Sequence, residues 1–367
     1  MSIIIFIAVL VLLILAHELG HFLVAKYFNI RADEFGIGLP PRLTTLFRWG
    51  ETDFTLNAIP FGGFVKIYGE DPGEEPVKEE DQDRHFANKH RGIQAAVLLA
   101  GVFFNALLAF VLITIAFTVG VPTSGEMHDP DHIKDPKATI SYVKENSPAE
   151  NAGLQVGDVV SRIQIEDGEA ISIATSRELS DLVNDEGGEE LTIYYEREGV
   201  EKETSLVPQE DLLEKDGAAI GVALSTVGVV SFPPHLAFVE GAKHTVELTG
   251  IIAVELSRFL GSVVTGGADF SEVAGPVGIV GLVGDAWEVG LSFLLYFTAV
   301  ISLHLTIINL LPFPALDGGR LLFVAIEAAT RRKIKPQVAN ALNAIGFILL
   351  IILMIAVTTN DVIRIFS

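Results

Sequence analysis

His17-Glu18-Leu19-Gly20-His21 lies inside the first long apolar stretch of the chain, which covers residues 2 to 28. Charged and strongly polar side chains are costly at membrane depth, and those found there usually have a function. Residues four apart share one face of a helix, so His17 and His21 can bind one metal ion between them. Glu18 lies beside them and can take a proton from a water molecule at that ion. The pattern predicts a metal centre with its own general base inside a membrane span.

Three further apolar stretches are long enough to cross a bilayer, which takes about 20 residues. They cover residues 93–121, 289–311 and 339–359. The first stretch lacks a positively charged start and stays apolar beyond the His-Glu pair, which argues against a cleaved signal peptide. We therefore expect an α-helical polytopic membrane protein with four transmembrane helices.

Composition supports a membrane bundle with one soluble module. The chain has 367 residues, of which 50% are hydrophobic, and its mean hydropathy is +0.45. It has no cysteine, so a metal must be bound by histidine and carboxylate. The net charge of −22 lies mainly in residues 121–225, which indicates a solvated acidic surface. No basic stripe is present, so we expect no nucleic-acid partner.

The distribution of lysine and arginine predicts how the chain is oriented in the membrane. They concentrate in residues 26–91 and in the short connection 320–337, so both segments should be cytoplasmic by the positive-inside rule. Four spans then place both termini and residues 122–288 outside. Because His21 lies so close to Lys26, the metal should lie within roughly 8 Å of the cytoplasmic end of the span.

Residues 30–70 should form short β-hairpins near the metal. Residues 53–59 alternate like a strand, and glycine and proline pairs punctuate the segment. An open strand edge there could pair with an extended peptide. The alternative is a cytoplasmic hairpin without a catalytic role. Residues 70–84 are acidic and predict a mobile linker.

Residues 138–227 predict a compact inserted β-rich domain, because strand-like runs recur along them with one helix-like run between. Residues 235–264 are amphipathic with few helix breakers. We expect them to form a helix on the outer membrane surface.

A catalytic zinc site needs a third protein ligand, and Asp317 is the best candidate. It ends the run Asn309-Leu-Leu-Pro-Phe-Pro-Ala-Leu-Asp-Gly-Gly319, at the cytoplasmic end of the third span and so at the depth of the histidines. The alternative role for Asp317 is to cap the following helix. His304 could also approach the site, although a hydrogen-bonded packing role suits it better.

With these motifs together, the chain closely resembles the site-2 protease family of intramembrane zinc metalloproteases, in particular the bacterial regulator-of-sigma-E proteases. The resemblance covers nearly the whole chain. Besides the histidine motif and the Asn309–Gly319 run, it is carried by Gly36-Ile37-Gly38, by Pro60-Phe61-Gly62-Gly63-Phe64-Val65-Lys66 and by Gly275-Pro276-Val277-Gly278.

The resemblance implies a role for each matching residue. His17, His21 and Asp317 would bind Zn²⁺, and Glu18 would be the general base. The substrate backbone would be held by Asn309 and by the strand that contains Gly62, Gly63, Phe64, Val65 and Lys66. Residues 145–158 resemble the PDZ domains of extracytoplasmic proteases, which bind peptide C-termini or extended segments. The chain has room for one such domain, whereas some relatives carry two.

The implied activity is hydrolysis of peptide bonds within transmembrane segments. The substrates would be single-span proteins already trimmed by an upstream site-1 protease, such as anti-sigma factors, or remnant signal peptides. The implied location is the bacterial cytoplasmic membrane. The alternatives are a catalytically inactive scaffold that presents a PDZ domain, and a metal transporter.

The sequence therefore predicts eight segments in chain order. They are a transmembrane helix (1–28), a β-hairpin region with an acidic linker (29–91), a second transmembrane helix (92–121), a PDZ-like domain (122–230), an amphipathic surface helix and loop (231–288), a third transmembrane helix (289–319), a cytoplasmic connection (320–338) and a fourth transmembrane helix with the C-terminus (339–367).

Overall fold

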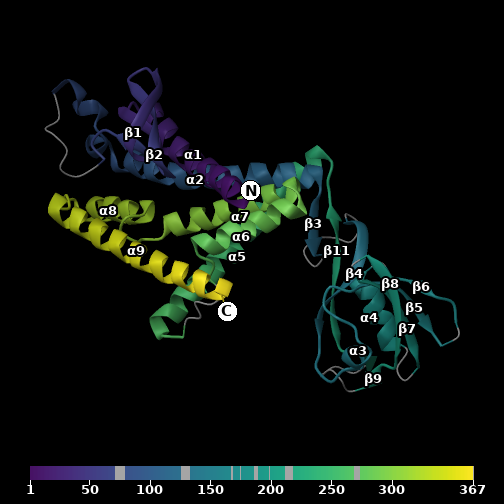
Figure 1. The fold of residues 1–367 in the computed structure, drawn as a ribbon. Coiled ribbons are helices and arrows are strands. Elements are labelled where there is room, and N and C mark those ends of the chain that lie inside the picture. Colours follow the sequence, from purple (N-terminus) through teal and green to yellow (C-terminus); the bar gives the residue numbers. More distant parts are fainter. Residues whose placement is uncertain are drawn as a thin grey trace. The chain divides into compact units, whose positions relative to one another are not determined.

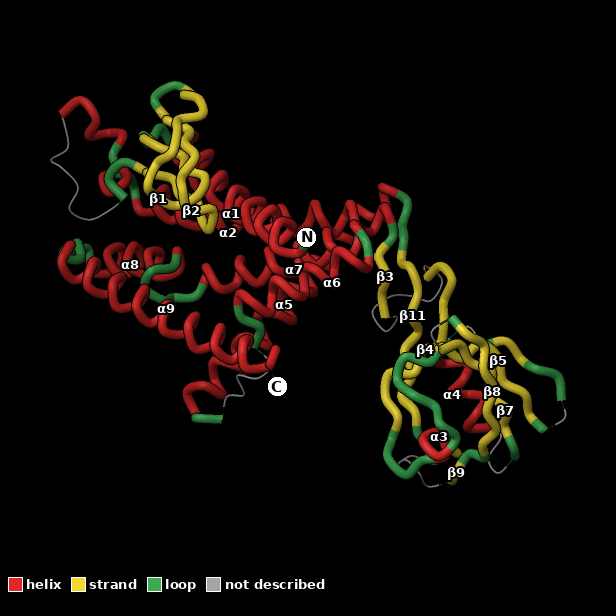
Figure 2. The backbone as a smooth tube through the Cα atoms, viewed as in Figure 1, coloured by secondary structure: helices red, strands yellow, loops and turns green. Residues whose placement is uncertain are grey.

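A computed structural model describes residues 1–70, 79–124, 133–166, 168–173, 175–185, 189–197, 199–210, 218–267 and 273–366. The chain divides into two compact units. One combines residues 1–116 with 238–367, and the other holds residues 117–237. Helices dominate the first unit and strands the second (Figures 1 and 2).

Four helices among the described residues are long and apolar enough to cross a membrane. They are α1 (Ser2–Tyr27), α2 (Arg91–Val119), α7 (Leu291–Leu310) and α9 (Pro336–Phe366). The most apolar 18 residues of each helix have a mean hydropathy between 2.0 and 2.7. Side chains this apolar can face lipid without a cost in free energy. The four apolar stretches that the sequence predicts as spans are therefore helices of membrane-spanning length and composition.

Three more helices complete this unit: α5 (Pro234–Thr265), α6 (Pro276–Val289) and α8 (Asp317–Thr330). One expectation is wrong here: besides the expected helix, the segment 231–288 contains α6 where a loop is expected. Most of the expected connection 320–338 is helical and belongs to α8. Short helices next to apolar spans are hard to separate from them by hydropathy, and a single glycine, Gly290 with φ 141°, ends α6 and starts α7.

The core of this unit joins the first span to α6 and α7. Val9 and Leu13 of α1 pack against Val283 and Ala286 of α6 and Leu294 of α7. These side chains are at most 7% exposed, so α1 is fixed along its N-terminal half by apolar packing.

Strands β1 (Ala32–Trp49) and β2 (Thr52–Ile67) form one sheet instead of separate short hairpins. Residues 32–37 pair with 63–67 on one side and with 53–56 on the other, and residues 42–49 pair with 52–57. Each long strand therefore contributes two segments, in the spatial order 63–67, 32–37, 52–57, 42–49. Residues 63–67 have a paired neighbour on one side only among the described residues. The alternation of apolar and polar residues could not reveal this register. It indicates a strand, but it does not show whether that strand pairs on one edge or on both.

Aromatic side chains fasten the sheet to α1. The ring of Phe22 lies 5.7 Å from that of Phe35 and 5.6 Å from that of Phe54, both edge to face. Phe22 is fully buried, so the sheet lies on α1 at the residue directly after the histidine motif.

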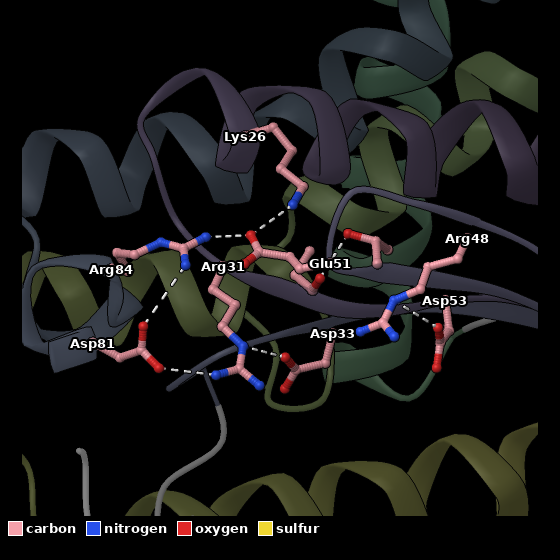
Figure 3. A network of polar contacts seen from close by, with 10 residues as sticks. Lys26, Arg31, Asp33, Arg48, Glu51, Asp53, Asp81 and Arg84 are labelled. Atoms are coloured by element: carbon pink, nitrogen blue, oxygen red, sulfur yellow. Dashed lines mark hydrogen bonds and ion pairs between the residues drawn. The ribbon is translucent and has the colours of Figure 1, made fainter.

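The linker prediction was partly wrong. Residues 71–78 lie outside the described residues, but Glu79–Arg84 form a 3₁₀ helix, η1, which is followed by a second one, η2 (Phe86–Asn88). Two ion pairs hold η1: Asp81 accepts from Arg31, and Arg84 donates to Glu51 (Figure 3). Charge pairing thus gives this acidic segment a fixed structure that composition alone does not suggest.

The second unit is built on a seven-stranded sheet with two short helices, α3 (Pro148–Asn151) and α4 (Ser176–Asp185). The strand order is β3-β11-β4-β5-β7-β8, with β6 beside β5. The strands are β3 (Val121–Ser124), β4 (Ile133–Val143), β5 (Val159–Ile165), β6 (Ile171–Ser172), β7 (Leu191–Arg197), β8 (Val200–Leu206) and β11 (Val222–Val230), with the separate pair β9 (Gln209–Glu210) and β10 (Ala218–Ala219). A β-rich inserted unit is therefore present.

Candidate metal centre

Three side chains meet at one point beside α1. His17 and His21 lie one turn apart on α1, and their Nε2 atoms are 3.1 Å apart. Asp317, the first residue of α8, brings its Oδ2 to 3.0 Å from His17 Nε2 and 3.3 Å from His21 Nε2. The ligand atoms of all three residues lie within 4.8 Å of one another. The structure therefore brings together the three residues that the sequence predicts as ligands.

The chemistry of this donor set fits a divalent cation. Neutral imidazole and carboxylate are the ligands that Zn²⁺ takes where no thiolate is present. Asp317 Oδ2 is buried and has no hydrogen-bond partner within the described part of the chain. A buried carboxylate oxygen facing two imidazole nitrogens is costly unless a positive charge lies between them.

Asp317 does not cap its helix. The N-cap position is taken by Leu316, and Asp317, the first helical residue, has its Oδ2 turned toward the histidines. The two glycines that follow let the loop fold tightly beneath it: a Cβ on Gly318 would lie 2.2 Å from the Leu311 carbonyl oxygen, and one on Gly319 2.2 Å from that of Phe313. The Gly-Gly pair therefore permits the close turn that delivers Asp317 to α1.

Helix α2 forms the back wall of the centre, which sequence reasoning missed. The Val97 carbonyl accepts a hydrogen bond from His21 Nδ1 at 2.8 Å, and the Asn105 amide lies 3.2 Å from His17 Nδ1. Between them, a Cβ on Gly101 would lie 2.3 Å from His21 Nε2. These α2 residues are four apart and so share one helix face. A polar Asn within an apolar span was the signal available in the sequence.

A cavity of about 370 Å³ opens in front of the histidines. It is lined by His17, Glu18, His21, Phe64, Val65, Lys66, Ile67, Glu70, Asp317 and Arg320. The Glu18 carboxylate accepts a hydrogen bond from the Val65 backbone. The predicted base and the edge segment of the sheet therefore face the same space as the three ligands.

Of the remaining candidate residues, two glycines lie in the sheet beside α1, and two residues of α7 lie outside the cavity lining and the ligand cluster. Gly63 lies against α1, where a Cβ would be 3.5 Å from Glu18 Cγ, and Gly62 has a φ of +125° that favours glycine. Asn309 is half-buried in the last turn of α7 and is outside the cavity lining. His304 is exposed and bonds to the Val300 carbonyl of its own helix at 2.9 Å. It does not join the ligand cluster.

Comparison with known proteins gives a consistent result. Residues 5–353 match the model of peptidase family M50. A protein of Clostridium acetobutylicum assigned as a zinc metalloprotease is 33% identical over 352 residues, which cover 96% of this chain and 94% of the relative. Zinc metalloprotease RasP of Oceanobacillus iheyensis is 29% identical and is matched over 100% of this chain and 99% of its own.

A solved structure was also matched within the chain. The PDZ domain of the SdrC-like protein of Listeria monocytogenes is 23% identical and covers 25% of this chain and 88% of its own, with a TM-score of 0.21. A TM-score of this size assigns no fold, so the family rests on the full-length matches. On those matches, the chain belongs to peptidase family M50 and is a membrane zinc metalloprotease.

Proposed function

We propose that this protease binds zinc through His17, His21 and Asp317 and cleaves peptide bonds within the membrane, with Glu18 as its general base. The observation that carries the proposal is the convergence of the three ligand atoms on α1, a helix apolar enough to span a bilayer. Zinc, when bound, supplies a Lewis acid that polarises a carbonyl and lowers the pKa of a water molecule from 15.7 to about 7.

The chain's own residues handle the proton. Glu18 lines the same cavity as the ligands, so its carboxylate can take a proton from the attacking water and later pass it to the leaving amine. The hydrogen bond from the Val65 backbone orients this carboxylate. Apolar packing of α1 keeps Glu18 in register with the two histidines.

The substrate backbone is held by the edge segment that contains Gly62, Gly63, Phe64, Val65 and Lys66. A transmembrane helix must unwind before its carbonyls can be attacked, and unpaired backbone groups are costly in lipid. Pairing the unwound segment with this edge would keep those groups hydrogen-bonded. Asn309 is a less direct candidate for the same task, because it is outside the cavity lining.

The substrates are single-span membrane proteins already trimmed by an upstream site-1 protease, or remnant signal peptides. The location is a bacterial cytoplasmic membrane, with both termini and the β-rich unit outside and the catalytic centre near the cytoplasmic side. The distribution of lysine and arginine supports this orientation.

Glu18→Gln tests the mechanism. The change is nearly isosteric and removes the base, so zinc content and thermal stability should stay at the wild-type level while cleavage of a model transmembrane substrate is lost. Purified protein in detergent gives all three readouts: metal analysis, a thermal unfolding curve, and peptide products identified by mass spectrometry. Turnover by this variant at the wild-type rate would refute the role of Glu18. A metallated wild type that cleaves no membrane peptide would favour the inactive scaffold.

The β-rich unit, residues 117–237, acts as a PDZ-like filter that binds peptide C-termini or extended segments and limits which substrates reach the centre. Replacing residues 138–227 with a short Gly/Ser bridge should preserve zinc and the cleavage of short substrates. It should also admit substrates with bulky outer domains that the intact enzyme refuses. If the shortened protein stays metallated but loses all cleavage, the filter role is wrong.

A further inference from the structure

Asn105 is a buried polar side chain in the middle of a membrane-spanning helix. It is 1% exposed, and it lies on α2 with its amide toward His17 Nδ1 at 3.2 Å. Polar groups at such positions are costly unless they are paired, so their retention points to a task. None of the steps proposed above uses this residue.

His21 shows what a second partner does for a ligand on the same helix. Its Nδ1 faces the Val97 carbonyl, which can only accept a hydrogen bond, so the ring must carry its proton on Nδ1. Nε2 is then unprotonated and points at Asp317. The carbonyl thereby selects the tautomer that can bind a cation.

The tautomer of His17 depends in the same way on which end of the Asn105 amide faces its Nδ1. An amide NH₂ toward Nδ1 would make that nitrogen an acceptor and leave the proton on Nε2, where it would block metal binding. Half a turn about the Cβ–Cγ bond brings Oδ1 to this position instead. In the structure Nδ2 occupies this position, 3.2 Å from His17 Nδ1, while Oδ1 is buried and has no hydrogen-bond partner within the described residues, so no competing bond opposes the half turn.

The backbone of Asn105 is held independently of its side chain. Ser302 on α7 is fully buried and donates its hydroxyl to the Asn105 carbonyl at 2.8 Å. This bond fixes α2 against α7 at the level of the metal ligands. The carboxamide is therefore presented to His17 from a fixed position, as second partners of metal-binding histidines usually are.

We propose that Asn105 is a positioning residue of the metal centre: its carboxamide oxygen accepts the Nδ1–H of His17 and holds that ring with an unprotonated Nε2 toward the cation. The proposal rests on the proposed function in one respect, that His17 is a ligand. Together with the Val97 carbonyl, it makes one face of α2 the element that sets both imidazole tautomers.

Zinc affinity of the full-length protein in detergent is the direct test. Metal-free protein is titrated with Zn²⁺ against a competing chromophoric chelator. Asn105→Leu keeps the volume of the side chain but removes the acceptor, and the Kd for zinc should rise roughly 10- to 100-fold. Asn105→Asp restores an acceptor for Nδ1–H and should return the Kd to near the wild-type value. Asn105→Ala serves as the loss variant if the Leu protein does not fold.

Ser302→Ala is the matched control, because it loosens α2 from α7 without touching the imidazole. It should lower the melting temperature of the metal-free protein and leave the Kd for zinc unchanged. Asn105→Leu should raise the Kd for zinc and leave that melting temperature unchanged. Wild-type affinity in both loss variants, or an Asp variant as weak as Leu, would overturn the proposal. Zinc binding that survives His17→Ala would instead show that the proposed ligand set is wrong.

Discussion

Asp317 and Glu51 each face two nitrogen-bearing side chains from distant parts of the sequence. Asp317 Oδ2 lies 3.0 and 3.3 Å from the Nε2 atoms of His17 and His21. Glu51 Oε1 accepts from Lys26 at 3.0 Å and from Arg84 (Figure 3). In the sequence both are acidic residues near turns, and the difference lies in the partners.

Lysine and arginine are charged donors at neutral pH, and both contact Oε1 of Glu51, which they stabilise as an anion. It fastens the end of α1, the turn between β1 and β2 and the helix η1 to one another. An imidazole in its neutral form has a lone pair of its own, so in that form the two histidines and Asp317 present a set of acceptors to one point. The nature of the nitrogen partner therefore separates a metal centre from a structural ion pair.

Removing the carboxylate from the metal centre should have the largest effect. Asp317→Ala leaves two ligands, so zinc occupancy should fall and cleavage should drop by roughly a thousandfold or more, as when one member of a catalytic unit is lost. Metal analysis of the purified protein measures the first effect, and product formation the second. Glu51→Gln is the control and should retain full zinc. If both variants stay fully metallated, the distinction between the two carboxylates fails.

A proline in the edge segment of the sheet, residues 63–67, tests whether this segment pairs with the substrate backbone. The N–H of Val65 points toward Glu18, so it should also face the substrate, while the N–H of Lys66 should point toward β1. Val65→Pro removes the N–H that orients Glu18 as well as a donor to the substrate, so kcat/KM should fall by at least about tenfold, the worth of one hydrogen bond, with zinc retained. Lys66→Pro should lower the melting temperature more than it lowers kcat/KM. Equal and modest effects of the two prolines would argue against strand addition.

Glu51→Gln should have the smallest effect, a loss of about 1 kcal/mol in the free energy of unfolding, since exposed ion pairs contribute little. The guanidinium of Arg84, helped by Lys26, lowers the pKa of Glu51 from 4.5 to about 2. Its stabilisation is therefore complete above pH 4.5 and is lost as the pH falls toward 2. Chemical unfolding of wild type and variant should differ at pH 7 and converge in acid. A difference that persists at pH 2 would contradict this origin.

The four spans and the ligand cluster could be predicted because each follows from a local rule. Span length is set by bilayer thickness, and an i, i+4 spacing puts His17 and His21 on one face whatever the rest of the chain does. Asp317 needed one further step, that both spans end at the same depth. Helix α6 escaped prediction, since apolar composition does not show where one helix stops and the next begins.

The sheet and the α2 wall depend on contacts that a sequence does not record. Alternation in residues 53–59 indicates a strand but not the two partners between which it lies, so the edge position of residues 63–67 appears only in the fold. The Val97 carbonyl has no sequence signature at all, because every residue has one. Asn105 was visible as a polar interruption of an apolar run, and it was the one clue that could have led to α2.

The absence of a side chain at Gly101 leaves the space that the two imidazoles occupy. A Cβ there would lie 2.3 Å from His21 Nε2 and 2.7 Å from His17 Cε1, so one methyl group would displace the imidazoles. Alanine favours an isolated helix over glycine by about 1 kcal/mol, but here the added methyl group would overlap both imidazoles and force them to move. Helix propensity and the space for the two side chains therefore make opposite demands at this position, and the glycine satisfies the second.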